Sequence, residues 1–187
     1  MENFLSDAGK KSLLMDARET LCASLEGRKT RYNEPLPELA ASHGVFVTLR
    51  TGKGELRGCI GNLWGGSEPL YLLVRKMVLA SAFDDPRFPS VRKEELGGLS
   101  LEISVLSDFV ESSADDVEPG KHGILIRRGS RSGILLPQVA TEQGWDRVQF
   151  LRHGCLKAGL PAESWKEDDV LISVFTALVF NEEEFLL

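Results

Sequence analysis

Residues 44–61 read GVFVTLRTGKGELRGCIG, and this stretch predicts the β-hairpin around which the rest of the fold is arranged. Two runs in which apolar and polar residues alternate flank the turn TGKG. The glycines of that turn permit the backbone angles that a tight hairpin connection requires. In the first run Val45, Val47 and Leu49 share one face, which is typical of a strand that covers a core on one side only.

The second run contains Cys59, whose neighbours are unusual for a core strand. Alternation places Cys59 on the polar face beside Arg57, away from the apolar residues of the run, whereas a bulge at Gly58 or Gly61 would shift this alternation. A neighbouring arginine favours the thiolate, which is the nucleophilic form of cysteine. Gly58 and Gly61 would let a ligand approach the backbone, but glycines also permit tight strand packing. A reactive role and a structural role for Cys59 both stay open, because free cysteine is often buried.

Composition limits the classes of protein to consider. The chain has 187 residues, of which 42% are hydrophobic and 27% charged, as in an ordinary globular protein. Its net charge of −6 argues against a protein that binds polyanions over its whole surface. No run of about 18 apolar residues predicts a membrane span, and the N-terminus does not resemble a secretory signal. Three widely spaced cysteines indicate neither a disulfide framework nor a zinc site, so we expect a cytoplasmic protein with reduced thiols.

The remaining pattern alternates hairpins with helices, which predicts an α+β fold rather than a regularly wound parallel sheet. Apolar spacings of three and four residues predict helices, and alternation predicts strands. Two helices are predicted in the first half of the chain, one over 7–27 that stops at Gly27 and one that is capped by Ser67 and ends near Ala82. A strand over 99–107 and a hairpin over 123–137 follow. The last predicted elements are one or two helices within 137–158, with Asp146 as a cap, and a central strand over 170–180.

The loop FDDPRFPSV carries a second candidate for chemistry. Its two prolines stiffen it, so Asp84, Asp85 and Arg87 are expected to be held in place. One of the two carboxylates would act as a general acid or base, while Arg87 would bind an anion. The alternative is that Asp84 or Asp85 caps a turn and pairs with an arginine, since Asp-Pro is a common turn former.

Gln138 is a third candidate. Pro137 predicts the first turn of a helix directly after a strand, and the free N–H groups of such a turn bind anions. Gln138 would hydrogen-bond a base or an amide there, or would simply belong to a helix start packed by its apolar neighbours. Cys22 falls at the edge of the apolar stripe of a predicted helix, where we expect a partly buried filler in preference to a reactive thiol. Cys155 falls on the apolar side of the last predicted helix, where we expect it to pack in the core.

Four segments, in this order, resemble the AMMECR domain family: ELRGCIGNL, ASAFDDPRFPSV, LEISVLS and GILLPQVATEQGWDRVQFLRHGCLKAGLP. The resemblance spans roughly residues 10–181. It implies a two-lobed α+β fold in which βαββ-type repeats exchange strands, with residues 1–187 forming one domain of a larger and a smaller subdomain. Bacterial members are often called AmmeMemoRadiSam system protein A. They are encoded with a Memo-like protein and a radical-SAM protein, which the resemblance implies as partners.

We therefore expect a ligand-binding or active cleft around LRGCIG, the DDPR loop and the helix start at Gln138. In one hypothesis the protein is an enzyme, or part of one, that modifies a small molecule or RNA, with Cys59 as nucleophile or ligand contact. Asp84 or Asp85 would be its acid or base, and Arg57 and Arg87 would bind an anion. In the other, the protein is a non-catalytic module that binds a nucleotide, RNA or another protein. The sequence contains no convincing set of metal ligands and does not indicate a cofactor.

Overall fold

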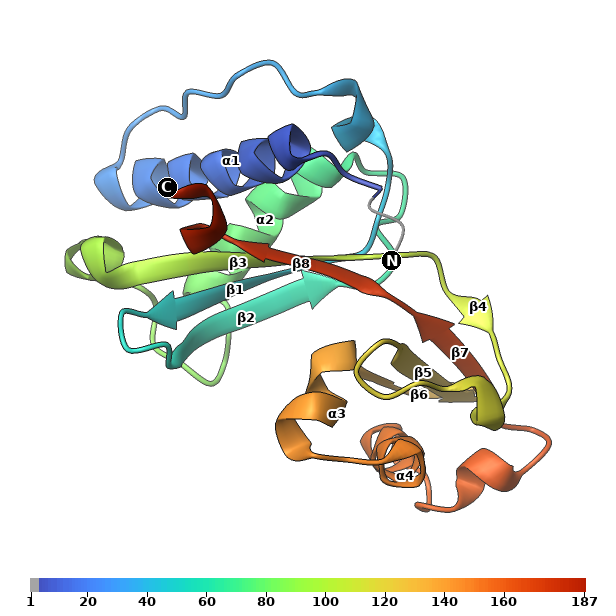
Figure 1. The fold of residues 1–187 in the computed structure, drawn as a ribbon. Coiled ribbons are helices and arrows are strands. Elements are labelled where there is room, and N and C mark those ends of the chain that lie inside the picture. The colour runs from blue at the N-terminus through green and yellow to red at the C-terminus, as the bar shows by residue number, and fades with distance from the viewer. Residues whose placement is uncertain (1–3) are drawn as a thin grey trace. The chain divides into compact units, whose positions relative to one another are not determined.

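The computed structural model describes residues 4–187, which form two compact units. Unit 1 comprises the chain up to Leu106 together with Leu178–Leu187, and unit 2 comprises Ser107–Ala177. The end of the chain therefore returns to the unit in which the chain begins. Each unit combines one four-stranded sheet with helices (Figure 1), so the predicted α+β class is confirmed.

Unit 1 is built on a sheet with the strand order β2-β1-β3-β8. Its strands are β1 (Val45–Thr51), β2 (Leu56–Asn62), β3 (Leu99–Leu106) and β8 (Ala177–Asn181). Helices α1 (Asp7–Glu26) and α2 (Leu70–Phe83) lie over one face of this sheet (Figure 1). The predicted hairpin is present as β1 and β2, and the apolar face of β1 is fully buried in the core of this unit.

The ends of α1 follow from local sequence. The Ser6 hydroxyl accepts a hydrogen bond from the Gly9 N–H at 3.1 Å, which satisfies one of the free N–H groups of the first turn. At the other end Gly27 has a φ of 65°, a left-handed conformation that glycine adopts without strain. Leu14 and Leu21 on one side of the helix are fully buried, so the helix predicted over 7–27 is confirmed.

Strand β2 contains a bulge at Arg57. Leu49 of β1 faces Gly58, whereas the next residue, Arg50, faces Leu56. One residue of β2 is therefore left without a partner across the ladder, and this residue is Arg57. The bulge changes the alternation along β2, so Arg57 does not keep the simple relation to Cys59 that the sequence pattern implies.

A helix side chain bridges β1 and β2 beside the bulge. The Ser81 hydroxyl of α2 accepts a hydrogen bond from the Ile60 N–H at 2.8 Å and donates one to the Val47 carbonyl at 2.7 Å. Val47 and Ile60 face each other across the ladder. Ser81 is 2% exposed, so this bridge satisfies polar groups that water does not reach.

Unit 2 has a sheet with the strand order β4-β7-β5-β6. Its strands are β4 (Val110–Glu111), β5 (Gly123–Arg128), β6 (Arg131–Leu135) and β7 (Leu171–Phe175), and its helices are α3 (Pro137–Gln143) and α4 (Arg147–Lys157). The Asp146 carboxylate accepts a hydrogen bond from the Gln149 N–H at 2.8 Å, so the predicted cap of α4 is confirmed.

Two predictions of elements are wrong. Residues 170–180 do not form one central strand, because β7 ends at Phe175 and β8 begins at Ala177 in the other sheet. A continuous apolar run conceals such a break, since each half needs apolar residues for its own sheet. Ser67 does not cap α2 either, because Pro69 occupies the capping position and makes no side-chain bond there.

Candidate functional site

Edge strand β2 and the loop after α2 meet at Cys59. The Asp85 carboxylate accepts a hydrogen bond from the Cys59 main-chain N–H at 2.8 Å. The Arg87 guanidinium donates to the Cys59 carbonyl at 3.2 Å and to the two Asp85 oxygens at 2.9 and 2.7 Å. The Arg87 main-chain N–H also donates to Asp85, at 3.1 Å. Three of the residues singled out in the sequence are thus in direct contact.

Asp85 is held as a buried, ionised carboxylate. Asp85 is 4% exposed, and its carboxylate accepts hydrogen bonds from Cys59 and Arg87. The hydrogen bonds from the Arg87 guanidinium hold the pKa of Asp85 far below its ordinary value, although burial acts in the opposite direction. A carboxylate with a lowered pKa is a weak base. The geometry therefore favours a positioning role for Asp85, which fixes the loop to the backbone of β2.

The thiol of Cys59 has different neighbours from its backbone. The Thr48 hydroxyl, directly across the ladder, donates a hydrogen bond to Cys59 Sγ at 3.3 Å. The thiol also interacts with the Arg87 guanidinium and, after Asp85, contributes to the raised pKa of Arg87. Within the described part of unit 1, no carboxylate or imidazole is hydrogen-bonded to this thiol, and the His43 ring stacks on Phe4 instead. The arginine beside Cys59 is therefore Arg87.

The glycines that flank Cys59 face protein atoms. A Cβ added to Gly58 would lie 2.1 Å from the Ser81 carbonyl oxygen of α2. A Cβ added to Gly61 would lie 2.3 Å from the Phe46 ring. Both glycines thus permit close packing, and the space that their missing side chains leave is already filled.

Arg57 lies on the wall of a cavity of about 460 Å³, here called the Arg57 cavity. The lining residues are Arg57, Pro89, Ser90, Arg92, Glu94 and Glu95. Arg57 donates to both Glu95 oxygens, at 2.8 and 3.1 Å, and these bonds lower the pKa of Glu95. The remaining guanidinium nitrogen of Arg57, Nη1, is buried and has no hydrogen-bond partner in the structure of residues 4–187. Cys59 does not line this cavity.

The other two predicted site residues, Asp84 and Gln138, form no hydrogen bond in this contact among the described residues. Asp84 is exposed at the C-terminal end of α2, where its N–H donates to the Ala80 carbonyl, and its carboxylate has no hydrogen bond to any described residue. Gln138 belongs to the first turn of α3 in unit 2, and its Oε1 is buried without a partner among the described residues. Its predicted place in the same cleft as Cys59 stays a prediction.

Sequence reasoning missed three side chains that shape this region: Ser81, Thr48 and Glu95. Thr48 was predictable as a neighbour of Cys59 once the hairpin register is known. Ser81 and Glu95 carry no comparable signal, because they reach β2 from 21 and 38 residues away along the chain. Residues 4–187 contain no group of three or more metal-ligating side chains, and none of their helices is long and apolar enough to cross a membrane.

Comparison with known proteins places these features in a family. The AMMECR1 family profile matches residues 14–180. Protein MK0488 of Methanopyrus kandleri is 45% identical over 181 residues, with 90% of this chain and 86% of that protein covered. Protein NEQ441 of Nanoarchaeum equitans is 39% identical over 175 residues, with 89% and 97% covered. The crystal structure of the uncharacterized protein PH0010 from Pyrococcus horikoshii gives a TM-score of 0.85 at 37% identity, covering 96% of this chain and 94% of that one.

The fold and site thus define an α+β protein with two antiparallel sheets and an edge strand fixed by a buried aspartate that pairs with a half-exposed arginine. The chain belongs to the AMMECR1 family, so the resemblance seen in its four motifs is confirmed. The names of these relatives state no activity.

Proposed function

We propose that the protein binds a small anionic molecule, of about the size of a nucleotide, in the Arg57 cavity. The observation that supports this most is the buried Nη1 of Arg57, which has no partner among the described residues. A buried N–H without an acceptor costs about 1–3 kcal/mol, so a ligand oxygen that reaches it recovers that energy. The volume of about 460 Å³ lies in the ordinary range for small-molecule sites.

The charges of the cavity narrow the class of ligand. Arg57 and Glu95 neutralise each other. Arg92 and Glu94 are exposed, and neither forms an ion pair in the described part of the chain. An anionic group would bind Arg92, and hydrogen-bond donors on the same molecule would bind Glu94. Nucleotides carry both kinds of group, which agrees with the hypothesis of a nucleotide-binding module.

Replacing Arg92 by alanine tests this proposal. We expect calorimetric titration to detect binding of AMP to the wild-type protein, and Arg92→Ala to weaken it about tenfold through loss of one charged hydrogen bond. Lys93→Ala is the matched control, because Lys93 is an exposed neighbour that does not line the cavity. Lys93→Ala should bind AMP as the wild type does.

The proposal is wrong if AMP does not bind, or if it binds Arg92→Ala and the wild type equally. A parallel titration uses a single-stranded RNA and a range of salt concentrations. If RNA binds tightly with a steep salt dependence and AMP does not bind, the ligand is RNA and not a small molecule.

Thiol chemistry at Cys59 is a second candidate function, supported by the Arg87 guanidinium next to the thiol. An arginine beside a cysteine is one of the arrangements in which a thiol acts as a nucleophile. We expect iodoacetamide at neutral pH to alkylate Cys59 before Cys22 and Cys155, and Arg87→Gln to slow that reaction, as peptide mass spectrometry would show. Equal rates at all three cysteines, or no reaction at Cys59, contradict this role.

The proposals for partners and location rest on the family resemblance. Association with a Memo-like protein and a radical-SAM protein, and a cytoplasmic location, belong to the same proposed function. Affinity purification from the native host, followed by mass spectrometry of bound proteins and metabolites, tests all of them together. If neither partner is recovered, the proposed complex is wrong, whereas the proposal that the Arg57 cavity binds a ligand is not affected.

A further inference from the structure

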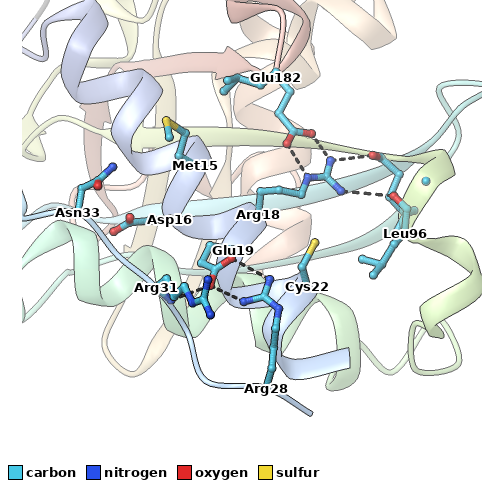
Figure 2. Close-up of a pocket in the computed structure, with 13 residues that line it drawn as sticks. Met15, Asp16, Arg18, Glu19, Cys22, Arg28, Arg31, Asn33, Leu96 and Glu182 are labelled. Carbon is cyan, nitrogen blue, oxygen red and sulfur yellow. Dashed lines mark hydrogen bonds and ion pairs between the residues drawn. The ribbon is translucent and has the colours of Figure 1, made fainter. Parts of the chain in front are cut away.

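A second cavity, of about 620 Å³, lies in unit 1 against α1 (Figure 2). It shares no lining residue with the Arg57 cavity. One wall is a face of α1, another is the segment 28–36, here called the strap, and a third comes from residues 96–99 and 182–187. We call it the α1 cavity.

Polar contacts fix the strap to the helices before any ligand arrives. The Tyr32 hydroxyl lies 2.9 Å from the Thr20 hydroxyl of α1, and the Arg75 guanidinium lies 3.4 Å from the centre of the Tyr32 ring. The Arg31 main-chain N–H donates to Glu19 at 2.6 Å. A preformed cavity binds a ligand without the cost of ordering its walls.

Most charged side chains of the α1 cavity are already paired. Arg28 donates to the two Glu19 oxygens at 2.6 and 2.9 Å, and these bonds, together with the bond from the Arg31 N–H, lower the pKa of Glu19 to about 2. Arg18 pairs in the same way with both oxygens of Glu182 (Figure 2). These four side chains therefore offer little net charge to a ligand.

Two polar side chains of the strap remain available. The side chains of Arg31 and Asn33 are exposed and form no hydrogen bond or ion pair with any described residue. Asp16, at the same end of the cavity, is buried and accepts two hydrogen bonds from Arg75, at 3.0 and 2.5 Å. The Arg31 guanidinium is thus the charged group of the lining that forms no ion pair with a described residue, although its charge also acts on Glu19 and lowers the pKa of that carboxylate.

The rest of the lining is apolar. Met15 is 43% exposed on α1, and Leu96, Leu99 and Leu187 lie on the third wall. From this combination we propose that the α1 cavity is a second binding site, which takes a small organic anion with an apolar body. The anionic group binds Arg31 and Asn33, and the body lies between Met15 and the three leucines.

Cys22 provides a reporter inside this cavity. It lies on the α1 wall, is partly exposed and is a free thiol. A bound molecule covers Cys22 and slows its alkylation, whereas Cys59 does not line this cavity and should react as before. The ratio of the two rates therefore locates the bound molecule without an assay of activity.

The experiment uses anilinonaphthalene sulfonate, an aromatic anion that fluoresces in apolar surroundings, and its neutral relative N-phenylnaphthylamine. We expect both to bind the whole protein. Arg31→Gln should weaken the sulfonate about fivefold and leave the neutral probe unchanged, because only the anion uses the guanidinium. Met15→Glu should weaken both, because it places a charge on the apolar wall. The bound sulfonate should slow iodoacetamide labelling of Cys22 and not of Cys59.

Lys29→Gln is the control, since Lys29 is an exposed strap residue that does not line the cavity. Both probes should bind this variant as they bind the wild type. The inference is overturned if the sulfonate does not bind, if it binds Arg31→Gln as tightly as the wild type, or if it protects Cys59 in place of Cys22. None of these outcomes bears on AMP binding in the Arg57 cavity.

Discussion

At Cys59 the main chain and the thiol form hydrogen bonds with different residues. The carboxylate of Asp85 and the guanidinium of Arg87 fix its N–H and carbonyl, whereas the thiol meets the Thr48 hydroxyl. The loop that carries Asp85 thus fixes the position of the Cys59 main chain, but it provides no general base to the thiol. A role for Cys59 in chemistry depends on Arg87, which lies beside the thiol and is half exposed.

Replacing Asp85 by asparagine tests its positioning role. Asp85→Asn keeps the shape and removes the charge, so we expect a loss of about 2 kcal/mol in the free energy of unfolding at neutral pH. The folded pKa of Asp85 is lowered, so its stabilisation is present above the unfolded pKa of about 4 and is lost as the pH falls through the folded value. Urea denaturation at about pH 7 and about pH 3 should show the difference shrink.

Asp84→Asn is the control for that comparison, because the Asp84 carboxylate is exposed and has no hydrogen bond to a described residue. It should leave the free energy of unfolding close to that of the wild type. A loss from Asp85→Asn that is equal at both pH values would show that charge is not the cause.

At the scale of elements, β2 depends on α2 as much as on β1. The Ser81 hydroxyl joins the two strands, and the Ser81 carbonyl lies where a side chain at residue 58 would stand. Glycine at this position is therefore required by the close approach of a helix. The β1–β2 hairpin and α2 are therefore packed tightly together at this contact.

Gly58→Ala tests that contact. The new Cβ would lie 2.1 Å from the Ser81 carbonyl oxygen, which cannot rotate away as a flexible side chain would. We expect a loss of about 2 kcal/mol in the free energy of unfolding from overpacking. Gly98→Ala is the control, because no atom lies within 4 Å of its added Cβ. Equal thermal midpoints for the two variants would contradict the close packing of α2 on β2.

These elements show how far the sequence predicts the fold and the site. Periodicity and turn residues predict α1 and both hairpins, because each depends on neighbours a few residues apart. Alternation fails at Arg57, because the bulge adds one residue to β2 and so changes the alternation along the strand. The divided strand at 170–180 and the partner of Arg57 also escape prediction, because both depend on contacts between distant segments.

At the scale of the whole molecule, unit 1 is completed by residues that follow unit 2 in the chain. Glu182, directly after β8, is 4% exposed and accepts hydrogen bonds from Arg18 of α1 and from the Leu101 N–H of β3. One carboxylate thus joins the last segment of the chain to the first helix and to the sheet.

Glu182→Gln tests how much the Arg18–Glu182 ion pair contributes to the free energy of unfolding. It leaves the Arg18 guanidinium, which is largely buried, without its counter-charge, so we expect a loss of about 3 kcal/mol in the free energy of unfolding. Glu183→Gln, a change at an exposed neighbour, should have little effect. Circular dichroism during urea titration measures both, and equal midpoints would show that the Arg18–Glu182 pair contributes little.

The same connection has a consequence for synthesis on the ribosome. Residues 107–177, which form unit 2, are synthesised as one continuous segment. Unit 1 is complete only after residues 178–187 have also been synthesised. Until then, the Leu101 N–H and the Arg18 guanidinium have no carboxylate to bind, and β3 presents a free edge where β8 will later pair. The nascent chain therefore carries an unpaired β3 edge while residues 107–177 are synthesised, and such an edge favours pairing with another chain.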